Sequence, residues 1–356
     1  MDFKERFTQD IIIEKFSLGE IPIAEAFNKL FKVDEINIGH SYERRVYREE
    51  KSLNLKPVDN IERSKEKNRE EKEQLKNLLE EMDELIGLEE VKRIIKEYIA
   101  FIKVQKLRES YNLKTAPVVM HMIFKGNPGT GKTTMARIIG KIFKEIGYLK
   151  GGELIEVERA DLVGEYIGHT AQKTKKVLER ALGGVLFIDE AYSLARGGEK
   201  DFGKECIDTL VKGMEDYKDR LIIILAGYRN EMDYFLKTNP GLASRFAIQI
   251  DFPDYSLEEL VQIAELMYKE REYILDEKSK HYIYRVLSEL RNKELINGNA
   301  RTVRNLVERS IRQHARRIIK LENISRNDLL YIRKEDLLGE EGKNEEMPCN
   351  RDAQCR

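Results

Sequence analysis

The chain has 356 residues, and its 63 Lys and Arg residues nearly balance its 64 Asp and Glu residues, which leaves a net charge of −1. This balance provides no long-range attraction to nucleic acid or to an anionic membrane. No apolar run approaches the roughly 18 residues of a membrane span, the first residues lack a signal-peptide layout, and the three cysteines suggest no disulfide framework. We therefore expect a cytoplasmic protein with about two or three domains and no membrane span.

The N-terminal part of the chain divides into two segments. Residues 1–60 are of mixed character and predict no particular fold. Residues 61–84 alternate in charge sign, which predicts a charged, solvated helical linker. A short coiled coil is the alternative, but its apolar seam would begin too late for several heptads. That seam consists of Leu75, Leu78, Leu79 and Met82.

From Leu85 onward, apolar runs typical of strands alternate with amphipathic helical patterns. The runs are 118–124, 154–157, 185–188, 221–226 and 247–252. Continuous apolar strands separated by helices predict a parallel sheet covered on both faces. We therefore expect a three-layer α/β/α domain over residues 85–252.

Beyond Pro253 the expected elements are helical. Helical patterns cover 257–271, 277–290 and 301–319, and Ser256 with Glu259 forms a capping-box signature before the first of them. These patterns predict a small all-helical domain over 253–336. The composition of residues 337–356 predicts a disordered tail.

A phosphate-binding loop follows the first strand of the expected sheet. The sequence G-x-x-x-x-G-K-T stands between a predicted strand and a predicted helix, as this motif requires. Glycines let the backbone N–H groups surround phosphates, and the helix N-terminus adds partial positive charge. We expect Lys132 to reach the β- and γ-phosphates of ATP, and the Thr133 hydroxyl to bind Mg²⁺. The expected nucleotide-binding residues are Gly126, Asn127, Pro128, Gly129, Thr130, Gly131, Lys132, Thr133 and Thr134.

Two adjacent carboxylates follow the third apolar run. Residues 185–188 bring Asp189 and Glu190 to the C-terminal end of a strand, where open α/β sheets bind ligands. Asp189 is expected to hold Mg²⁺, and Glu190 to orient and polarise the attacking water. Together, the loop and this acidic pair predict a P-loop ATPase.

Several further segments match a known family: MDELIGLEEVK, GNPGTGKTTMAR, DLVGEYIGHTA, LFIDEAYSL, ILAGY, NPGLASRF and GNARTVRN. With these segments, residues 85–320 resemble an AAA+ ATPase module. The chain is most similar to the branch that contains the stage V sporulation protein K and the red-type Rubisco activases. Its Ile-, Lys- and Glu-rich composition favours the sporulation branch slightly.

The resemblance implies roles for residues outside the two phosphate motifs. Arg245 matches the arginine finger that reaches the nucleotide of a neighbouring subunit, which implies a ring, expected to be a hexamer. Arg301 matches the sensor-2 arginine of a helical lid, with Arg304 as the alternative. Tyr166, Ile167 and Gly168 resemble the aromatic–aliphatic–glycine loop that grips polypeptide in the ring's pore.

Two further assignments by resemblance are less specific. The sensor-1 position is often Asn or Thr in this family, but alignment by strand end places Tyr228 there. Arg229 and Asn230 follow directly and are alternatives for the same role. Ile86 and Gly87 match the region that contacts adenine, and a simple helix start explains them equally well.

Three other classes of protein share some of these features. A GTPase is disfavoured because the sequence has no N-K-x-D motif. An AAA+ nucleic-acid motor is disfavoured because its channel needs Lys and Arg rather than an aromatic residue. A scaffold that binds ATP without hydrolysing it is disfavoured by Glu190 and Arg245. The expected function is therefore that of an ATP-driven motor that remodels a protein client, in sporulation or, alternatively, as a Rubisco activase.

Overall fold

The structure is a computed structural model that describes residues 72–115, 119–166, 168–196, 202–292 and 298–338. The predictions for residues 1–60, for the first part of the linker, for Ile167 and for residues 339–356 of the tail lie outside the described residues. Within these ranges, no helix combines the length and the apolar character that crossing a membrane requires.

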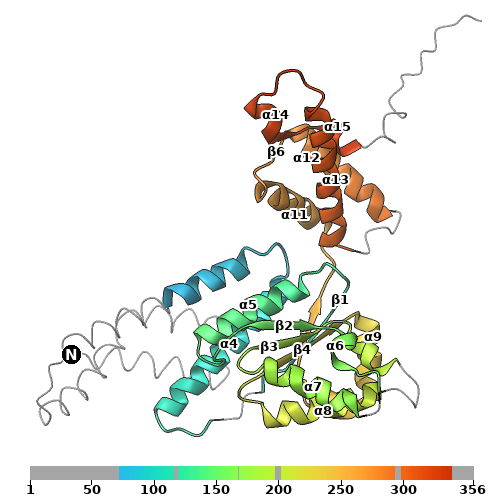
Figure 1. Ribbon diagram of the computed structural model, residues 1–356. Coiled ribbons are helices and arrows are strands. Elements are labelled where there is room, and N and C mark those ends of the chain that lie inside the picture. The colour runs from blue at the N-terminus through green and yellow to red at the C-terminus, as the bar shows by residue number, and fades with distance from the viewer. Residues whose placement is uncertain (1–71, 116–118, 167, 197–201, 293–297, 339–356) are drawn as a thin grey trace, which may run out of the picture.

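A parallel sheet of five strands lies between two layers of helices (Figure 1), so the predicted α/β/α architecture is confirmed. The strand order is β2-β3-β4-β1-β5, and every pairing is parallel. Each strand overlaps one of the five apolar runs that predicted it. The strands are β1 Met122–Gly126, β2 Leu154–Val157, β3 Val185–Ile188, β4 Ile222–Gly227 and β5 Ile248–Phe252.

Alternate residues of the central strands face opposite helical layers, which explains why these strands are apolar throughout. Met122 and Phe124 belong to a core cluster shared with α4 and α5, whereas Ile123 belongs to the cluster shared with α7, α8 and α9. The longer helices are α4 Glu89–Ser110, α5 Lys132–Glu145, α7 His169–Arg180, α8 Gly203–Asp216 and α9 Arg229–Thr238. Short helical segments are α6 Arg159–Leu162, η2 Ala191–Ala195 and α10 Pro240–Ala243.

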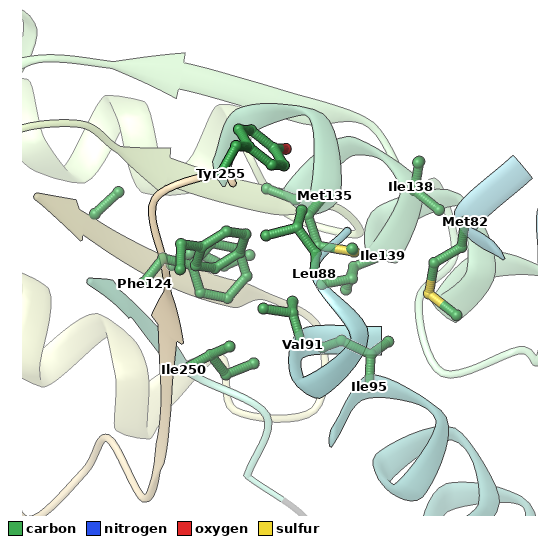
Figure 2. Packing of buried hydrophobic residues seen from close by; sticks show 14 of the residues in the cluster. Met82, Leu88, Val91, Ile95, Phe124, Met135, Ile138, Ile139, Ile250 and Tyr255 are labelled. Carbon is green, nitrogen blue, oxygen red and sulfur yellow. The ribbon is translucent and has the colours of Figure 1, made fainter. Parts of the chain in front are cut away.

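The first core cluster packs the beginning of α4 against α5 and the sheet. Figure 2 shows Leu88 and Val91 beside Met135 of α5 and Phe124 of β1. These side chains are at most 5% exposed. The cluster therefore fixes α5 on the sheet directly behind the loop that joins β1 to α5.

The described part of the predicted linker is a helix, 72–83, that packs on the α/β domain. Met82 is fully buried in the first core cluster, and the other three residues of the predicted seam pack against that cluster. Ion pairs tie this helix to its neighbours: Asp83 to Lys96 of α4 at 2.6 Å, and Glu81 to Lys141 of α5 at 3.4 Å. One apolar stripe at helical spacing suffices for docking, so this helix packs along one face while most of its other residues stay exposed.

A helical lid follows the sheet, as predicted. Ser256 Oγ accepts a hydrogen bond from the Glu259 N–H at 3.1 Å, and the Glu259 carboxylate accepts one from the Ser256 N–H at 2.6 Å, which confirms the capping box. The lid helices are α11 Leu257–Lys269, α12 Glu277–Asn292, α13 Ala300–Ile318, α14 Arg326–Leu330 and α15 Lys334–Leu338.

Two details of the lid differ from the sequence-based expectation. The lid is not entirely helical, because β6 (Ile274–Leu275) pairs in parallel with β7 (Tyr331–Ile332). Strands of two residues are too short to produce a readable period. Leu337, at the start of the predicted tail, is buried within α15. The lid therefore extends at least to residue 338, two residues beyond the predicted boundary at 336.

A buried histidine makes the stability of the sheet sensitive to acid. His121 Nδ1 accepts a hydrogen bond from the Ile223 N–H at 3.0 Å, so the ring is neutral at that nitrogen. Burial lowers the pKa of His121 from 6.5 to about 4. The unfolded chain therefore takes up this proton at a higher pH than the folded chain, and the histidine's contribution to stability is lost as the pH falls from 6.5 toward 4.

We expect His121→Gln, which keeps an acceptor but cannot titrate, to reduce this acid sensitivity. Between pH 7 and pH 4.5, its free energy of unfolding should fall by about 2 kcal/mol less than that of the wild type. Urea denaturation at the two pH values measures the difference. Equal losses for the two proteins would contradict the role of His121.

Candidate functional site

The loop between β1 and α5 forms a cradle with an open helix end. Gly129 and Gly131 have φ angles of 72° and 90°, a region that glycine enters without strain. Gly131 is the N-cap residue of α5, and no side chain caps this helix. The first N–H groups of α5 are therefore available to an anion, and the helix dipole favours one there. This geometry fits the phosphates of a nucleotide.

Lys132 lies folded onto this cradle. Its Nζ donates hydrogen bonds to the carbonyl oxygens of Gly126 at 2.8 Å and Asn127 at 2.7 Å. Burial lowers the pKa of Lys132, Asp189 and Asp254 raise it, and Arg301 lowers it. These couplings place residues from three separate segments around one ammonium group.

The acidic pair follows β3, as expected. Asp189 Oδ1 accepts a hydrogen bond from the Glu190 N–H at 2.9 Å. Glu190 has a φ of 46°, in the left-handed region that is uncommon for a residue other than glycine. Such backbone strain clusters at functional sites. The two carboxylates therefore stand at the carboxyl edge of the sheet, where Asp189 acts electrostatically on Lys132.

The donor set at this edge fits a magnesium ion. Asp189 supplies a carboxylate and Thr133 a hydroxyl, and Mg²⁺ prefers such oxygen ligands while keeping several waters. Among the described residues, no group of three or more His, Cys, Asp or Glu side chains could hold a metal.

The lid touches the cradle through the start of α13. The Ala300 N–H donates to the Gly129 carbonyl at 3.2 Å. A Cβ atom added to Gly129 would lie only 2.2 Å from the carbonyl oxygen of Gly298. Arg301, in the first turn of α13, is close enough to Lys132 to lower its pKa. The structure thus brings the first turn of α13, with the expected sensor-2 arginine, to the phosphate loop. Arg301 and the alternative, Arg304, are both exposed.

The expected adenine-contact region also lies beside the lid. Gly87 has a φ of 63°, and a Cβ at this position would meet the Glu259 carboxylate at 2.3 Å. Ile86 is partly buried against the first core cluster. The Tyr255 hydroxyl donates to the Thr130 carbonyl at 3.3 Å. These contacts place Ile86 and Gly87 at the joint between the α/β domain and the lid.

The sequence reasoning missed three residues at this joint: Asp254, Tyr255 and Asn299. Asp254 accepts hydrogen bonds from the side chains of both Asn127 and Asn299. Asp254 follows β5 directly, and Asn299 stands in the GNAR segment, two residues before Arg301. Because 45 positions separate Asp254 and Asn299, the sequence does not indicate that they pair. Their position next to motif residues could have marked them as candidates.

The expected arginine finger is held by its own chain away from the cradle. Arg245 Nη2 contacts the Glu215 carboxylate, and Nη1 donates to the Gly241 carbonyl at 2.9 Å. Its Nε is buried without a partner among the described residues. Within the described part of the chain, no hydrogen bond or ion pair joins Arg245 to the cradle.

The expected pore and sensor-1 residues lie on other loops. Tyr166 is 66% exposed, and its ring meets His169 edge to face at 5.6 Å. The ring of Tyr228 lies 6.1 Å from that of Tyr192, which follows Glu190 by two residues. Arg229, an alternative for sensor 1, instead pairs with Asp251 at 3.1 Å. The third alternative, Asn230, is exposed.

Comparisons with known proteins agree with this geometry. A family model described as the ATPase family associated with various cellular activities (AAA) matches residues 122–254, and an AAA lid domain model matches residues 256–347. Stage V sporulation protein K of Bacillus subtilis is 56% identical over 267 residues, 74% of this chain and 82% of that protein. The chloroplastic ribulose bisphosphate carboxylase/oxygenase activase of Cyanidioschyzon merolae is 45% identical over 270 residues, 74% of this chain and 92% of that protein.

A solved structure shares the fold. The FIGL-1 AAA domain in complex with ADP superposes with a TM-score of 0.50 and 20% identity, over 76% of this chain and 85% of that one. Two family models and a relative of 56% identity match this chain. They agree with the structure, which has the phosphate cradle, the acidic strand end and the lid. The chain therefore belongs to the AAA family of ATPases, the ATPases associated with various cellular activities, and it hydrolyses ATP.

Proposed function

We propose that this ATPase is a motor that works as a homo-oligomeric ring, a hexamer, and remodels or threads a protein client. The observation that carries the proposal is the placement of Arg245, which is bound to Glu215 and has no contact with its own cradle among the described residues. An arginine that serves a neighbour's nucleotide needs this separation. A guanidinium supplied in trans can accelerate phosphoryl transfer by about 10³–10⁵.

In the proposed site, each residue has one task. The cradle and Lys132 bind the phosphates of ATP, and Glu190 orients the attacking water for in-line transfer. Thr133 and Asp189 would hold Mg²⁺, which offsets negative charge on the phosphates when bound. Arg301 senses the nucleotide from the lid, and Tyr228 contributes one hydrogen-bond donor at the sensor-1 position.

The proposed client contact is the loop at Tyr166. Its aromatic ring is largely exposed, and Gly168 has a φ of 80° with open space around it. An exposed aromatic side chain grips polypeptide by packing and stacking rather than by reading its sequence. This chemistry and the near-neutral net charge favour a protein client over nucleic acid.

Sporulation is the proposed setting for this motor, and Rubisco activation is the alternative. The sporulation protein of Bacillus subtilis shares 56% identity with this chain, whereas the Rubisco activase shares 45%. Both relatives match about three quarters of the chain, so the difference in identity is not an effect of coverage. A pull-down from sporulating cells and one from cells that express Rubisco would distinguish the two settings.

A complementation experiment tests whether active sites are shared between subunits. Arg245→Ala and Glu190→Gln should each be inactive alone. In an equal mixture, an Arg245→Ala protomer receives the arginine of a Glu190→Gln neighbour, so about a quarter of the sites should recover ATPase activity. Phosphate release from the mixture measures this recovery.

Two results would contradict the shared site. One is full ATPase activity of Arg245→Ala alone, which would remove the arginine from the mechanism. The other is a mixture that forms rings by light scattering but remains inactive. Each variant alone, at the same total concentration, is the control.

A further inference from the structure

One carboxylate joins the phosphate loop to the lid. Both oxygens of Asp254 accept from Asn127 Nδ2 at 2.9 Å, and Asp254 Oδ1 also accepts from Asn299 Nδ2 at 2.8 Å. Asn127 belongs to the phosphate loop, Asp254 lies in the connection after β5, and Asn299 is the residue that precedes α13. We call these three residues the lid clasp.

The lid end of this clasp is held under strain. Asn299 is only 1% exposed, and it adopts φ 44° and ψ −125°, outside the conformations that residues other than glycine favour. Its Oδ1 accepts from the Tyr255 N–H at 3.0 Å, and its Nδ2 lies 3.4 Å from the Pro128 carbonyl. Such a conformation persists only where surrounding contacts over-determine it. Here the contacts come from both sides of the joint.

The backbones on the two sides of the joint approach too closely to move independently. Gly129 leaves no room for a Cβ beside Gly298, and its carbonyl accepts from the Ala300 N–H. A displacement of the phosphate loop is therefore passed to the first turn of α13. Arg301 is in that turn and follows Asn299 by two residues.

We propose that Asp254 is a positioning residue for ATP hydrolysis, which acts through Asn127 and Asn299 to hold Arg301 in register with the phosphate loop. This inference rests on the proposed role of Arg301 and extends it. A carboxylate suits the task because both of its partners present N–H donors, and hydrogen bonds to an ionised group are about twice as strong as neutral ones. An amide in its place would offer only one acceptor oxygen.

The central test is Asp254→Ala, measured by steady-state ATPase kinetics. We expect kcat to fall by about 10-fold to 100-fold, the factor that one or two charge-assisted hydrogen bonds supply. ADP affinity should change by less than about 3-fold, because the cradle itself is intact. A general loss of structure would instead weaken ADP binding and lower the melting temperature.

A double-mutant cycle tests whether Asp254 acts through Arg301. If it does, Asp254→Ala combined with Arg301→Ala should be about as slow as Arg301→Ala alone. Asn299→Gly, which tolerates the positive φ but lacks the amide, should reproduce the Asp254→Ala loss. Asn127→Ala tests the other end of the clasp at an exposed loop position. Glu308→Ala, an exposed acid on α13, is the matched control and should retain wild-type kinetics.

The outcomes separate this inference from the proposed function. Wild-type kcat for Arg301→Ala would overturn the sensor role on which the inference rests. Loss of activity in Arg301→Ala, together with wild-type kcat in Asp254→Ala, would overturn the clasp alone. Fully additive losses in the double variant would also overturn it, because Asp254 would then act independently of Arg301.

Discussion

Replacing Lys132 with alanine is expected to weaken ATP binding by about 100-fold or more, the largest effect on affinity of any single substitution in the cradle. The Lys132 ammonium lies at the phosphate loop, where it donates to the Gly126 and Asn127 carbonyls. A bound triphosphate would replace these carbonyls with charged oxygens, and hydrogen bonds between charged groups are the strong ones. Isothermal titration calorimetry measures the loss directly.

Lys141→Ala is the matched control for this substitution. Lys141 lies on the same helix, nine residues further on, and forms a surface ion pair with Glu81. Exposed pairs of this kind contribute about 1 kcal/mol or less, so the control should bind ATP normally. Unchanged ATP affinity in Lys132→Ala would show that the cradle does not bind the phosphates as proposed.

Glu190→Gln should leave ATP binding intact and lower kcat by about 10²–10⁴. Glutamine keeps the size of the side chain. Because it also has a Cβ atom, it experiences the same backbone strain at this positive φ as glutamate does. It cannot, however, accept a proton from water or polarise it as a carboxylate does. Comparing ATP affinity with the rate of phosphate release separates binding from turnover.

The same variant provides a way to identify the client. A motor that holds ATP without turnover should retain a bound polypeptide, so a pull-down with Glu190→Gln should recover a protein that wild type releases. Glu179→Gln is the control, since Glu179 is an exposed residue of α7 that pairs only with Lys175 at 3.8 Å among the described contacts. Normal phosphate release by Glu190→Gln would contradict its catalytic role.

Much of the fold was predictable because the sequence expresses it locally. The five strands are short apolar runs flanked by helical patterns, and the Ser256 capping box marks the start of the lid. The phosphate loop and the acidic pair were predictable for the same reason: each is a contiguous motif between recognisable elements. The pairing of β6 with β7 was not predictable, because strands of two residues are too short to show a hydrophobic period.

The contacts that join distant segments were not predictable from one sequence. Asp254 and Asn299 look like ordinary loop residues until the fold brings them to Asn127. The partner of Arg245 was not predictable either, because nothing in the sequence around Glu215 distinguishes it from the other acids of α8. Family resemblance supplied roles for Arg245 and Arg301, but the hydrogen bonds that hold Arg245 come from tertiary geometry.

The docking of helix 72–83 has a practical consequence for truncated proteins. A chain cut at residue 85, where the family segments begin, would lose Met82 and uncover the apolar surface of α4 and α5 that it seals. Burial of a methionine side chain contributes about 1.5–3 kcal/mol to the free energy of unfolding, and the shortened chain would lose this contribution. Shortened versions for crystallisation or binding assays should therefore begin at or before residue 72, or they will be less stable and prone to self-association.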